Sequence, residues 1–397
     1  MRRQPLPHPL LSLRKNSGLP LLFLLLIFLP LADMTFKIVR DVPVNEKRKM
    51  AAKPQFQPLR PWDFAKKYEA YFNDHFGFRS QLLHFHNLLT VRCFHASPID
   101  RVVVGGRGWL FIARENKTRS EMDYFRALRP FTPEELLHWR QILGQRRAWL
   151  ASRGIVYIFM VVPNKSTIYP EHLPANIRRL HEQSRLDQLL AALRLEGGFP
   201  VIDLRQTLLA AKNAHQLYKK TDSHWNELGA YFAYAEIMKK LSDHFPGLKI
   251  PALDHFTITR SDRAGGDLAQ MLSLQKKYYR EQTIQLQPQT PVGVKQVQIR
   301  KNIGPNIKVT ITESPAADLP AMLMVHDSFA HQLKPFLSPR FRRSVYIWDW
   351  GMHFFTKLIE REKPKIVIDE TTERFLCDLV LKNPSKLNQP AIPPASR

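Results

Sequence analysis

The chain has 397 residues, of which 44% are hydrophobic and 24% charged. These are ordinary globular values, so a wholly disordered, collagen-like or multi-span membrane protein is excluded, and one large domain with appendages fits as well as two domains. With 59 Lys and Arg against 35 Asp and Glu, the formal net charge is +24, which favours anionic partners such as an acidic polymer or a membrane surface. Nucleic-acid binding has no recognisable motif behind it, so we expect no such partner.

The N-terminal segment is typical of a membrane signal. Basic residues precede a mostly apolar stretch over 18–36 that approaches the roughly 20 residues of a full span. Its cleavage pattern is poor, because cleavage after Ala32 would put Pro30 where a small residue is needed. We predict a cytoplasmic N-terminus over 1–17, an uncleaved transmembrane anchor over 18–36 and a stalk over 37–60, with a cleaved signal peptide as the alternative. Basic residues on both sides leave the orientation open, although we expect an exported body.

The rest of the chain predicts one α/β domain over 61–381, followed by a flexible tail over 382–397. Helical spacing covers 62–89 with a break at 76–79, and 102–112 is predicted to be a hairpin with a glycine-rich turn. Thr132-Pro133-Glu134-Glu135 begins a helix that Gly154 ends. Further helices are predicted over 180–195 and 227–243, and a β-rich insertion over 250–316. An apolar run typical of a strand covered on both faces lies at 155–162, and further strands are predicted at 199–204, 321–325, 345–348 and 366–368.

This alternation predicts an α/β fold with a mostly parallel sheet flanked by helices. Ligands of such sheets bind outside the carboxyl ends of the strands, and two polar clusters are expected there. One contains Asp222, Ser223 and His224, and the other contains Asp327 and Ser328 directly after the strand 321–325.

The two clusters hold the parts that serine catalysis requires. A serine hydroxyl needs an imidazole to take its proton, and the imidazole needs a carboxylate to hold its tautomer. Asp222 and His224 are two residues apart, so in an extended segment both side chains point the same way. The turn that begins with Ser328 could present backbone N–H groups to an oxyanion.

Structural readings of the same residues compete with this one. In the structural alternative, Asp327 and Ser328 only cap the next helix, and Asp222 and His224 form a structural pair. The Gly-x-Ser-x-Gly elbow of α/β-hydrolases is absent, which disfavours that fold. No spacing typical of a metal site is present, so we expect no metal or organic cofactor. Cys93 and Cys377 either form one disulfide or remain two buried free thiols.

The segment from Asp222 to Tyr231, DSHWNELGAY, resembles the signature of the DHHW group, which belongs with the AlgJ/AlgX alginate O-acetyltransferase family and its SGNH-hydrolase-like domains. Other stretches resemble the family in the expected order: FNDHFGFR from Phe72, VGGRGWLF from Val104, VPNKSTIYP from Val162, HDSFAHQLKPFL from His326 and KPKIVIDETTERFL from Lys363. The resemblance covers roughly residues 60–380. It implies an SGNH-like domain with a permuted motif order, in which Asp-x-His precedes Ser.

Carried over by motif, Asp222 orients the imidazole, His224 is the general base and acid, and Ser328 is the nucleophile. Two residues depart from the family pattern: His326 stands where Gly is frequent, and Ser223 replaces the first His of DHHW. Three further residues are candidates for oxyanion or substrate contacts, each with a structural alternative. Asn164 and Lys165 could form a plain loop turn with a solvated lysine, and Trp225 could be a core residue rather than a sugar platform.

The resemblance implies an extracytoplasmic O-acetyltransferase that moves an acetyl group through a serine acyl-enzyme onto an exported or cell-surface polysaccharide. It also implies a polytopic membrane-bound O-acyltransferase as the acetyl donor. We expect a single-pass protein of the bacterial inner membrane with its catalytic domain in the periplasm. The alternatives are an ester or carbohydrate hydrolase with the same three residues, and a non-catalytic polysaccharide-binding scaffold.

Overall fold

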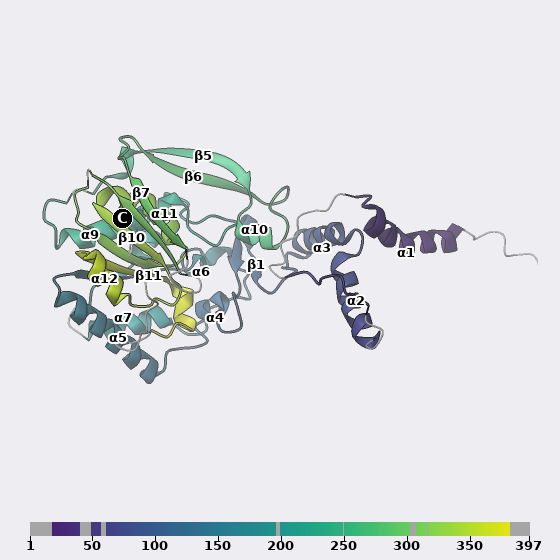
Figure 1. Ribbon diagram of the computed structural model, residues 1–397, viewed down its shortest axis with the longest axis horizontal. Helices are drawn as coiled ribbons and strands as arrows, with labels where there is room; N and C mark the ends of the chain where they lie inside the picture. Colours follow the sequence, from purple (N-terminus) through teal and green to yellow (C-terminus); the bar gives the residue numbers. More distant parts are fainter. Residues whose placement is uncertain are drawn as a thin grey trace, which may run out of the picture.

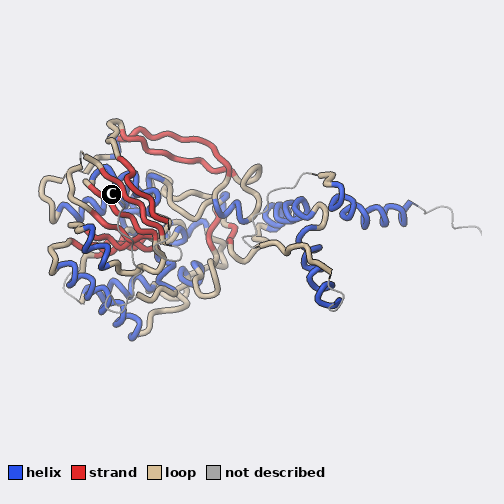
Figure 2. Tube along the Cα trace, in the orientation of Figure 1, coloured by secondary structure: helices blue, strands red, loops and turns tan. Residues whose placement is uncertain are grey.

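A seven-stranded sheet forms the centre of the computed structural model, which describes residues 18–39, 49–56, 61–195, 199–248, 250–301, 307–315 and 317–381. Figure 1 shows the sheet inside the body of the molecule, and Figure 2 shows the helices around it. The strand order is β4 (Val201–Asp203), β3 (Val156–Val162), β11 (Ile366–Thr372), β9 (Met322–His326), β10 (Arg343–Trp348), β8 (Lys308–Glu313) and β7 (Lys295–Lys301). The first five strands are parallel, which confirms the predicted fold class.

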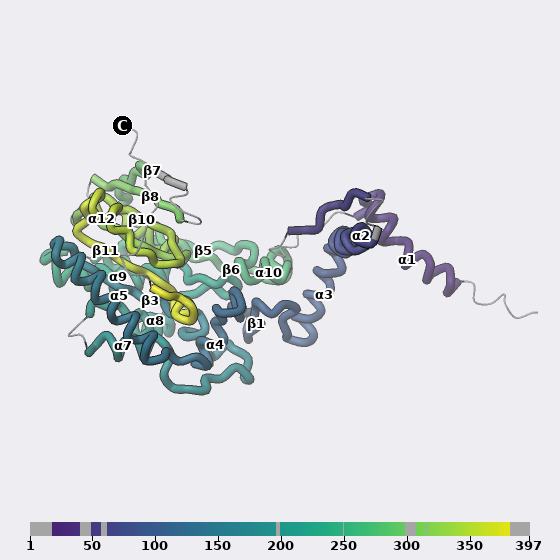
Figure 3. The backbone as a smooth tube through the Cα atoms, turned by 60° about the horizontal axis from the view of Figure 1, so that its bottom comes forward, coloured from purple at the N-terminus to yellow at the C-terminus, as the bar shows by residue number. Residues whose placement is uncertain are grey.

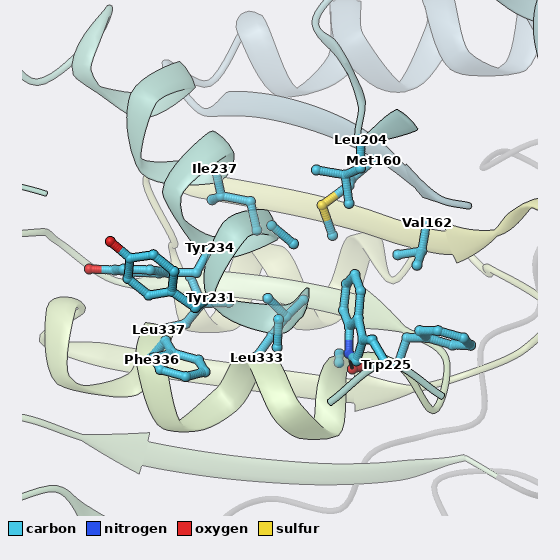
Figure 4. Close-up of a cluster of buried hydrophobic side chains, with 14 of the residues drawn as sticks. Met160, Val162, Leu204, Trp225, Tyr231, Tyr234, Ile237, Leu333, Phe336 and Leu337 are labelled. Atoms are coloured by element: carbon cyan, nitrogen blue, oxygen red, sulfur yellow. Dashed lines mark hydrogen bonds between the residues drawn. The ribbon is translucent and has the colours of Figure 1, made fainter. Parts of the chain in front are cut away.

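Helices cover both faces of this sheet because side chains alternate along its strands. In β3, Ile158, Met160 and Val162 belong to one buried cluster, and the residues between them belong to another. The first cluster includes side chains of α8 (Arg205–Ala211), α9 (Glu227–Ser242) and α11 (Ala330–Leu337). Figure 4 shows α9 and α11 packing there through aromatic and aliphatic side chains. The second cluster includes side chains of α5 (Pro133–Ala151), α7 (Arg185–Arg194) and α12 (Thr356–Glu362).

The helix starts follow capping chemistry. Thr132 caps α5 in a capping box with Glu135, as predicted, and Gly154 adopts a positive φ of 63° after the helix. The helix predicted over 180–195 begins later, because Ser184 forms a second capping box with Asp187. A cap at this point fixes the first turn of α7 at Arg185.

The predicted insertion over 250–316 is only partly separate from the sheet. The hairpin of β5 (Phe256–Ala264) and β6 (Arg280–Pro288) stands apart, with α10 (Asp267–Met271) between its strands in the chain. By contrast, β8 pairs antiparallel with β10, and β7 pairs with β8, so both strands extend the main sheet. The physical reason is that Val309 and Ile311 on β8 are buried in the core formed by that sheet.

Three N-terminal helices precede the body. They are α1 (Gly18–Phe36), α2 (Pro61–His75) and α3 (Arg79–Phe94). By length and composition, α1 could cross a membrane. In Figures 1 and 3, α1 and α2 lie away from the body, and α3 lies between these two helices and the body. The domain limits remain predictions, and the predicted segments 1–17 and 382–397 lie outside the described residues, as do 40–48 and 57–60 of the predicted stalk.

Two contact regions hold these helices in place. The carboxylate of Asp33, a buried residue of α1, accepts hydrogen bonds from the backbone N–H groups of Val39 (2.8 Å) and Phe78 (3.0 Å). At the other end, Asn87 of α3 donates to the carbonyl oxygen of Leu272 (2.9 Å), directly after α10. The arm of α2 and α3 therefore joins α1 to the side of the body where α10 lies.

Near this arm, β1 (Val102–Val104) and β2 (Leu110–Ile112) form the predicted hairpin. Two short helices, α4 (Glu121–Phe125) and α6 (Lys165–Ile168), complete the body. Cys93 is exposed and Cys377 is partly buried, and both are free. The disulfide alternative is therefore not found, and the expectation that both thiols are buried is wrong for Cys93.

Candidate active site

Ser328 lies in the turn between β9 and α11, at the carboxyl end of a central strand. Asp327 fixes this turn. Its Oδ1 accepts from the N–H of Phe329 (2.8 Å), and its Oδ2 accepts from the N–H of Thr372 at the end of β11 (2.9 Å). Its own N–H donates to the Glu370 carboxyl group (3.0 Å). Asp327 therefore anchors the serine turn to the neighbouring strand.

The second predicted cluster meets this turn. The His224 loop, which we define as residues 219–225, leads into α9 at the same edge of the sheet. Nε2 of His224 lies 2.8 Å from Oγ of Ser328, and Nδ1 lies 2.8 Å from Oδ1 of Asp222. The structure thus brings Asp222, His224 and Ser328 into one hydrogen-bonded chain, although His224 and Ser328 are 104 residues apart.

Electrostatics keep Asp222 ionised within this chain. Burial alone raises the pKa of the Asp222 carboxyl group, but the hydrogen bond from His224 and the positive charge of Lys219 outweigh that effect. The pKa of Asp222 therefore lies well below its usual range. A permanently ionised carboxylate holds the proton of the imidazole on Nδ1, which leaves the Nε2 lone pair directed at the serine hydroxyl.

Lys165 supports the His224 loop from inside the protein. Its ammonium group donates to the carbonyl oxygens of Lys219 (3.1 Å), Lys220 (3.2 Å) and Asp222 (2.7 Å). Burial lowers the pKa of Lys165 to about 8, although four surrounding acidic groups oppose the shift. With only 2% of its surface exposed, Lys165 is not the solvated lysine of the alternative interpretation, which is therefore wrong. Its ammonium group is occupied by the three carbonyl oxygens of the loop, so the role that the structure shows is support of the His224 loop.

Trp225 also lies in the core. It is fully buried, and its indole N–H donates to the carbonyl oxygen of Phe329 (3.0 Å). Figure 4 shows it packed among other buried side chains below α9. No ring face is available to a sugar, so the prediction that Trp225 contacts substrate is wrong. Its role is to join the His224 loop to the turn that carries Ser328.

Asn164 remains a candidate. It follows β3 and is fully buried, and its backbone N–H donates to the Glu373 carboxyl group (2.8 Å). Neither polar atom of its side-chain amide has a hydrogen-bond partner among the described residues. A buried amide without a hydrogen-bond partner is unusual in proteins. Binding of this amide to a reaction intermediate would explain it.

His326 is accommodated beside the serine turn. Its ring is fully buried, and Nδ1 donates to the carbonyl oxygen of Asp327 (2.6 Å). Burial and the nearby Lys334 ammonium hold the pKa of His326 well below its usual range, so the ring is neutral. The contact between His224 and Ser328 forms despite this side chain, which replaces the family's frequent glycine.

Two acidic residues that the motifs did not indicate also contact the His224 loop. The carboxylate of Glu281 on β6 accepts from the N–H groups of Lys220 (3.1 Å) and Thr221 (2.7 Å). Asp267, the first residue of α10, accepts from the N–H of Ser223 (2.7 Å). Within the described part of the chain, Asp222, His224 and Asp267 form a group close enough to hold a metal ion. The hydrogen bonds already account for the arrangement of these three side chains.

Comparison with known proteins places the chain among acetyltransferase domains. Residues 102–360 match the family model of the SGNH hydrolase-like domain of the acetyltransferase AlgX. The chain is 27% identical over 219 residues to the probable alginate O-acetylase AlgJ of Pseudomonas aeruginosa, covering 55% of this chain and 52% of that protein. It is 29% identical over 145 residues to the probable alginate O-acetylase AlgJ of Pseudomonas syringae pv. tomato, covering 36% and 34%.

The chain therefore spans about half the length of the first of these curated relatives, and less of the second. Among solved structures, it is similar to Bacillus cereus PatB1 with a sulfonyl adduct, with a TM-score of 0.50 and 15% identity over 70% of this chain and 99% of that one. At this identity the likeness concerns the fold. The family model spans most of the body, from β1 to α12. The chain thus belongs to the family of SGNH hydrolase-like domains of the AlgX acetyltransferase type.

Proposed function

We propose that the chain is an O-acetyltransferase that carries the acetyl group on Ser328. One observation carries this proposal: the chain of 2.8 Å contacts from Asp222 through His224 to Ser328. Such a chain suits a hydroxyl that must lose its proton to become a nucleophile. The family and the names of the curated relatives indicate that the transferred group is an acetyl group.

In the first half of the proposed reaction, Oγ of Ser328 attacks the carbonyl carbon of the acetyl donor while Nε2 of His224 takes the hydroxyl proton. The bond between that carbon and the leaving group then breaks, and His224 returns the proton to the leaving group. In the second half, an acceptor hydroxyl attacks acetyl-Ser328 and gives its proton to His224, which passes it to the departing Oγ. Asp222 stabilises the imidazolium in both halves.

We assign the oxyanion contact to the side-chain amide of Asn164. Its support is the position at the carboxyl end of β3, at the same sheet edge as Ser328, together with an amide N–H that no described residue uses. Preorganised donors at such a position stabilise the charge that develops on the carbonyl oxygen.

The proposed acceptor is an acidic polysaccharide. Two curated relatives are named as probable alginate O-acetylases, and the net charge of +24 favours a polyanion. The proposed donor is a polytopic membrane-bound O-acyltransferase. With α1 as a retained single-pass anchor in the inner membrane, the body lies in the periplasm. The length and apolar composition of α1 support this placement.

The test uses the full chain in membranes or nanodiscs, with a chromogenic acetyl ester as donor and a polyuronate as acceptor. Wild type should form acetyl-Ser328, detectable by peptide mass spectrometry, and pass the label to the polymer. Ser328→Ala and His224→Ala should abolish both steps, while Ser261→Ala, an exposed serine on β5, should abolish neither. Acetyl release to water without gain on adding polymer would favour a hydrolase. Labelling of the polymer by Ser328→Ala would refute the acyl-enzyme.

A further inference from the structure

Asp267 contacts the His224 loop near Nδ1 of His224, whereas Ser328 faces the other ring nitrogen, Nε2. Its Oδ1 accepts from the N–H of Ser223 (2.7 Å), and its Oδ2 accepts from the Ser223 hydroxyl (2.6 Å). Its own N–H faces Oδ2 of Asp222 at 3.3 Å. Both oxygens of the Asp267 carboxylate are thus committed to the residue next to His224.

The backbone before Asp267 is shaped for this approach. A Cβ atom on Gly266 would lie 2.3 Å from Cβ of Asp222 and 2.7 Å from its Oδ2, distances that real side chains do not reach. Only glycine lets the start of α10 come this close to Asp222. The N–H of Gly266 also donates to the hydroxyl oxygen of Thr221 (2.9 Å), which holds α10 on the loop.

The Ser223 hydroxyl connects the second carboxylate to the imidazole. Its oxygen lies 3.2 Å from Nδ1 of His224, and Oδ2 of Asp267 lies 3.9 Å from the same nitrogen. An ionised carboxylate is an acceptor only, so the single hydroxyl proton of Ser223 is donated to Asp267. The lone pairs of the hydroxyl oxygen then face the N–H at Nδ1, beside the main acceptor Asp222.

We infer that Asp267, acting through Ser223, is a second carboxylate that positions His224 and stabilises its imidazolium form. This inference rests on the proposed function, in which His224 carries the proton. Asp267 does not touch the reacting atoms, so it is a positioning residue. Ser223 stands where the DHHW signature has its first histidine, and its short side chain lets the Asp267 carboxylate approach the ring.

The size of the effect follows from the distance and the exposure. At about 4 Å, a unit negative charge raises the pKa of an imidazole by somewhat under one unit in water and by about three units at an effective dielectric constant of about 20. The side chains of His224 and Asp267 are 22% and 32% exposed, so we expect the lower part of this range, about one pH unit. Several other charged groups contribute to the field at His224 or its loop: Asp222, Glu281, Lys165, Lys219 and His331.

The experiment measures acylation of Ser328 by a chromogenic acetyl ester across pH, with the full chain in nanodiscs. Asp267→Asn should move the midpoint of the pH–rate profile about one pH unit lower and slow acylation about tenfold at its plateau. Ser223→Ala should move the midpoint in the same direction but by less, because the Asp267 charge remains. The double variant should add little to Asp267→Asn, because Ser223 acts only in combination with Asp267. Asp262→Asn, the same change at an exposed site on β5, should alter nothing.

A second readout keeps this inference separate from the proposed function. The ring nitrogens of His224 are followed by NMR in histidine-labelled protein, where Asp267→Asn should move the titration midpoint to lower pH even without turnover. If wild type fails to acylate, the proposed function is wrong and the NMR titration still decides the role of Asp267. Slower acylation by Asp267→Asn with both midpoints unchanged would overturn the inference, because that pattern belongs to a purely structural residue.

Discussion

Lys165→Met tests how far the geometry of the His224 loop depends on one buried cation. Methionine has nearly the length of lysine but no donor, so three carbonyl oxygens, including that of Asp222, lose their ammonium partner. An unsatisfied buried polar group costs about 1–3 kcal/mol. The ammonium is itself costly to bury, because burial lowers its pKa from 10.5 to about 8, which corresponds to about 3 kcal/mol.

The carbonyl oxygen of Lys220 keeps a second donor, the N–H of Leu110 (2.8 Å), so two carbonyls are left unsatisfied, at about 2–6 kcal/mol together. The relieved cost of burying the ammonium offsets about 3 kcal/mol of this, so we expect the free energy of unfolding to fall by no more than about 3 kcal/mol. The acylation rate should fall much further. The loop carries Asp222 and His224, and a displacement of about 1 Å in a catalytic group can reduce a rate about 10²-fold. The variant should therefore remain folded and be at least about a hundredfold slower.

The assay combines pre-steady-state acylation of Ser328 with chemical denaturation of the same preparations. Lys212→Met is the matched control, since Lys212 also donates to a carbonyl oxygen, that of Ile168 (2.7 Å), but has no contact with the His224 loop. It should acylate at the wild-type rate. A wild-type acylation rate in Lys165→Met would show that the loop keeps its geometry without the cation and would refute this reasoning.

Four more predictions follow from named contacts. The acylation rate should decline as pH rises through about 8, because neutral Lys165 offers two N–H donors to three carbonyls. Over pH 8 to 10.5, Lys165 should make the free energy of unfolding rise with pH, since the unfolded chain then binds more protons than the folded one. Asp222→Asn should slow acylation by less than the roughly 10⁴ typical of a single-carboxylate triad, because Asp267 remains; a full 10⁴ loss would contradict this. Gly266→Ala should disrupt acylation by displacing Asp222, while Gly293→Ala, with open space around it, should not. Arg146→Met should lower the unfolding free energy by about 3–5 kcal/mol in denaturant titrations, because the buried Asp369 carboxylate then keeps the Tyr157 hydroxyl as a donor but loses its positive partner, whereas Arg147→Met should cost far less.

Local chemistry allowed much of the fold to be predicted. The Thr132 capping box and the apolar run of β3 are properties of adjacent residues, and both have the predicted form. The end of β11 shows the limit. Its last residues, DETT from Asp369, look like a loop, yet they continue the strand and are buried. Partners elsewhere in the chain make that possible, as when Arg146 neutralises Asp369 (2.7 Å).

The candidate site divides in the same way. Asp222, His224 and Ser328 stand in motifs that can be read directly, and the structure brings these residues together. The residues that hold the loop could not be identified from the sequence, because their partners are 44 to 61 residues away in the chain. A lysine after a strand looks solvated until the three carbonyl oxygens around it are known. Likewise, Asp267 and Glu281 lie in a segment whose sequence indicates only an insertion.

The arm of α2 and α3 gives the proposed membrane topology a geometric meaning. Its 16-residue helix α3 spans about 24 Å and contacts the body at Leu272, a few residues after Asp267. The His224 loop therefore lies on the side of the body from which the arm leaves, and α1 is tied to the arm's far end through Asp33. In the proposed topology, the arm therefore sets the distance between the bilayer and the His224 loop, which is the distance over which the proposed membrane-bound donor has to deliver its acetyl group.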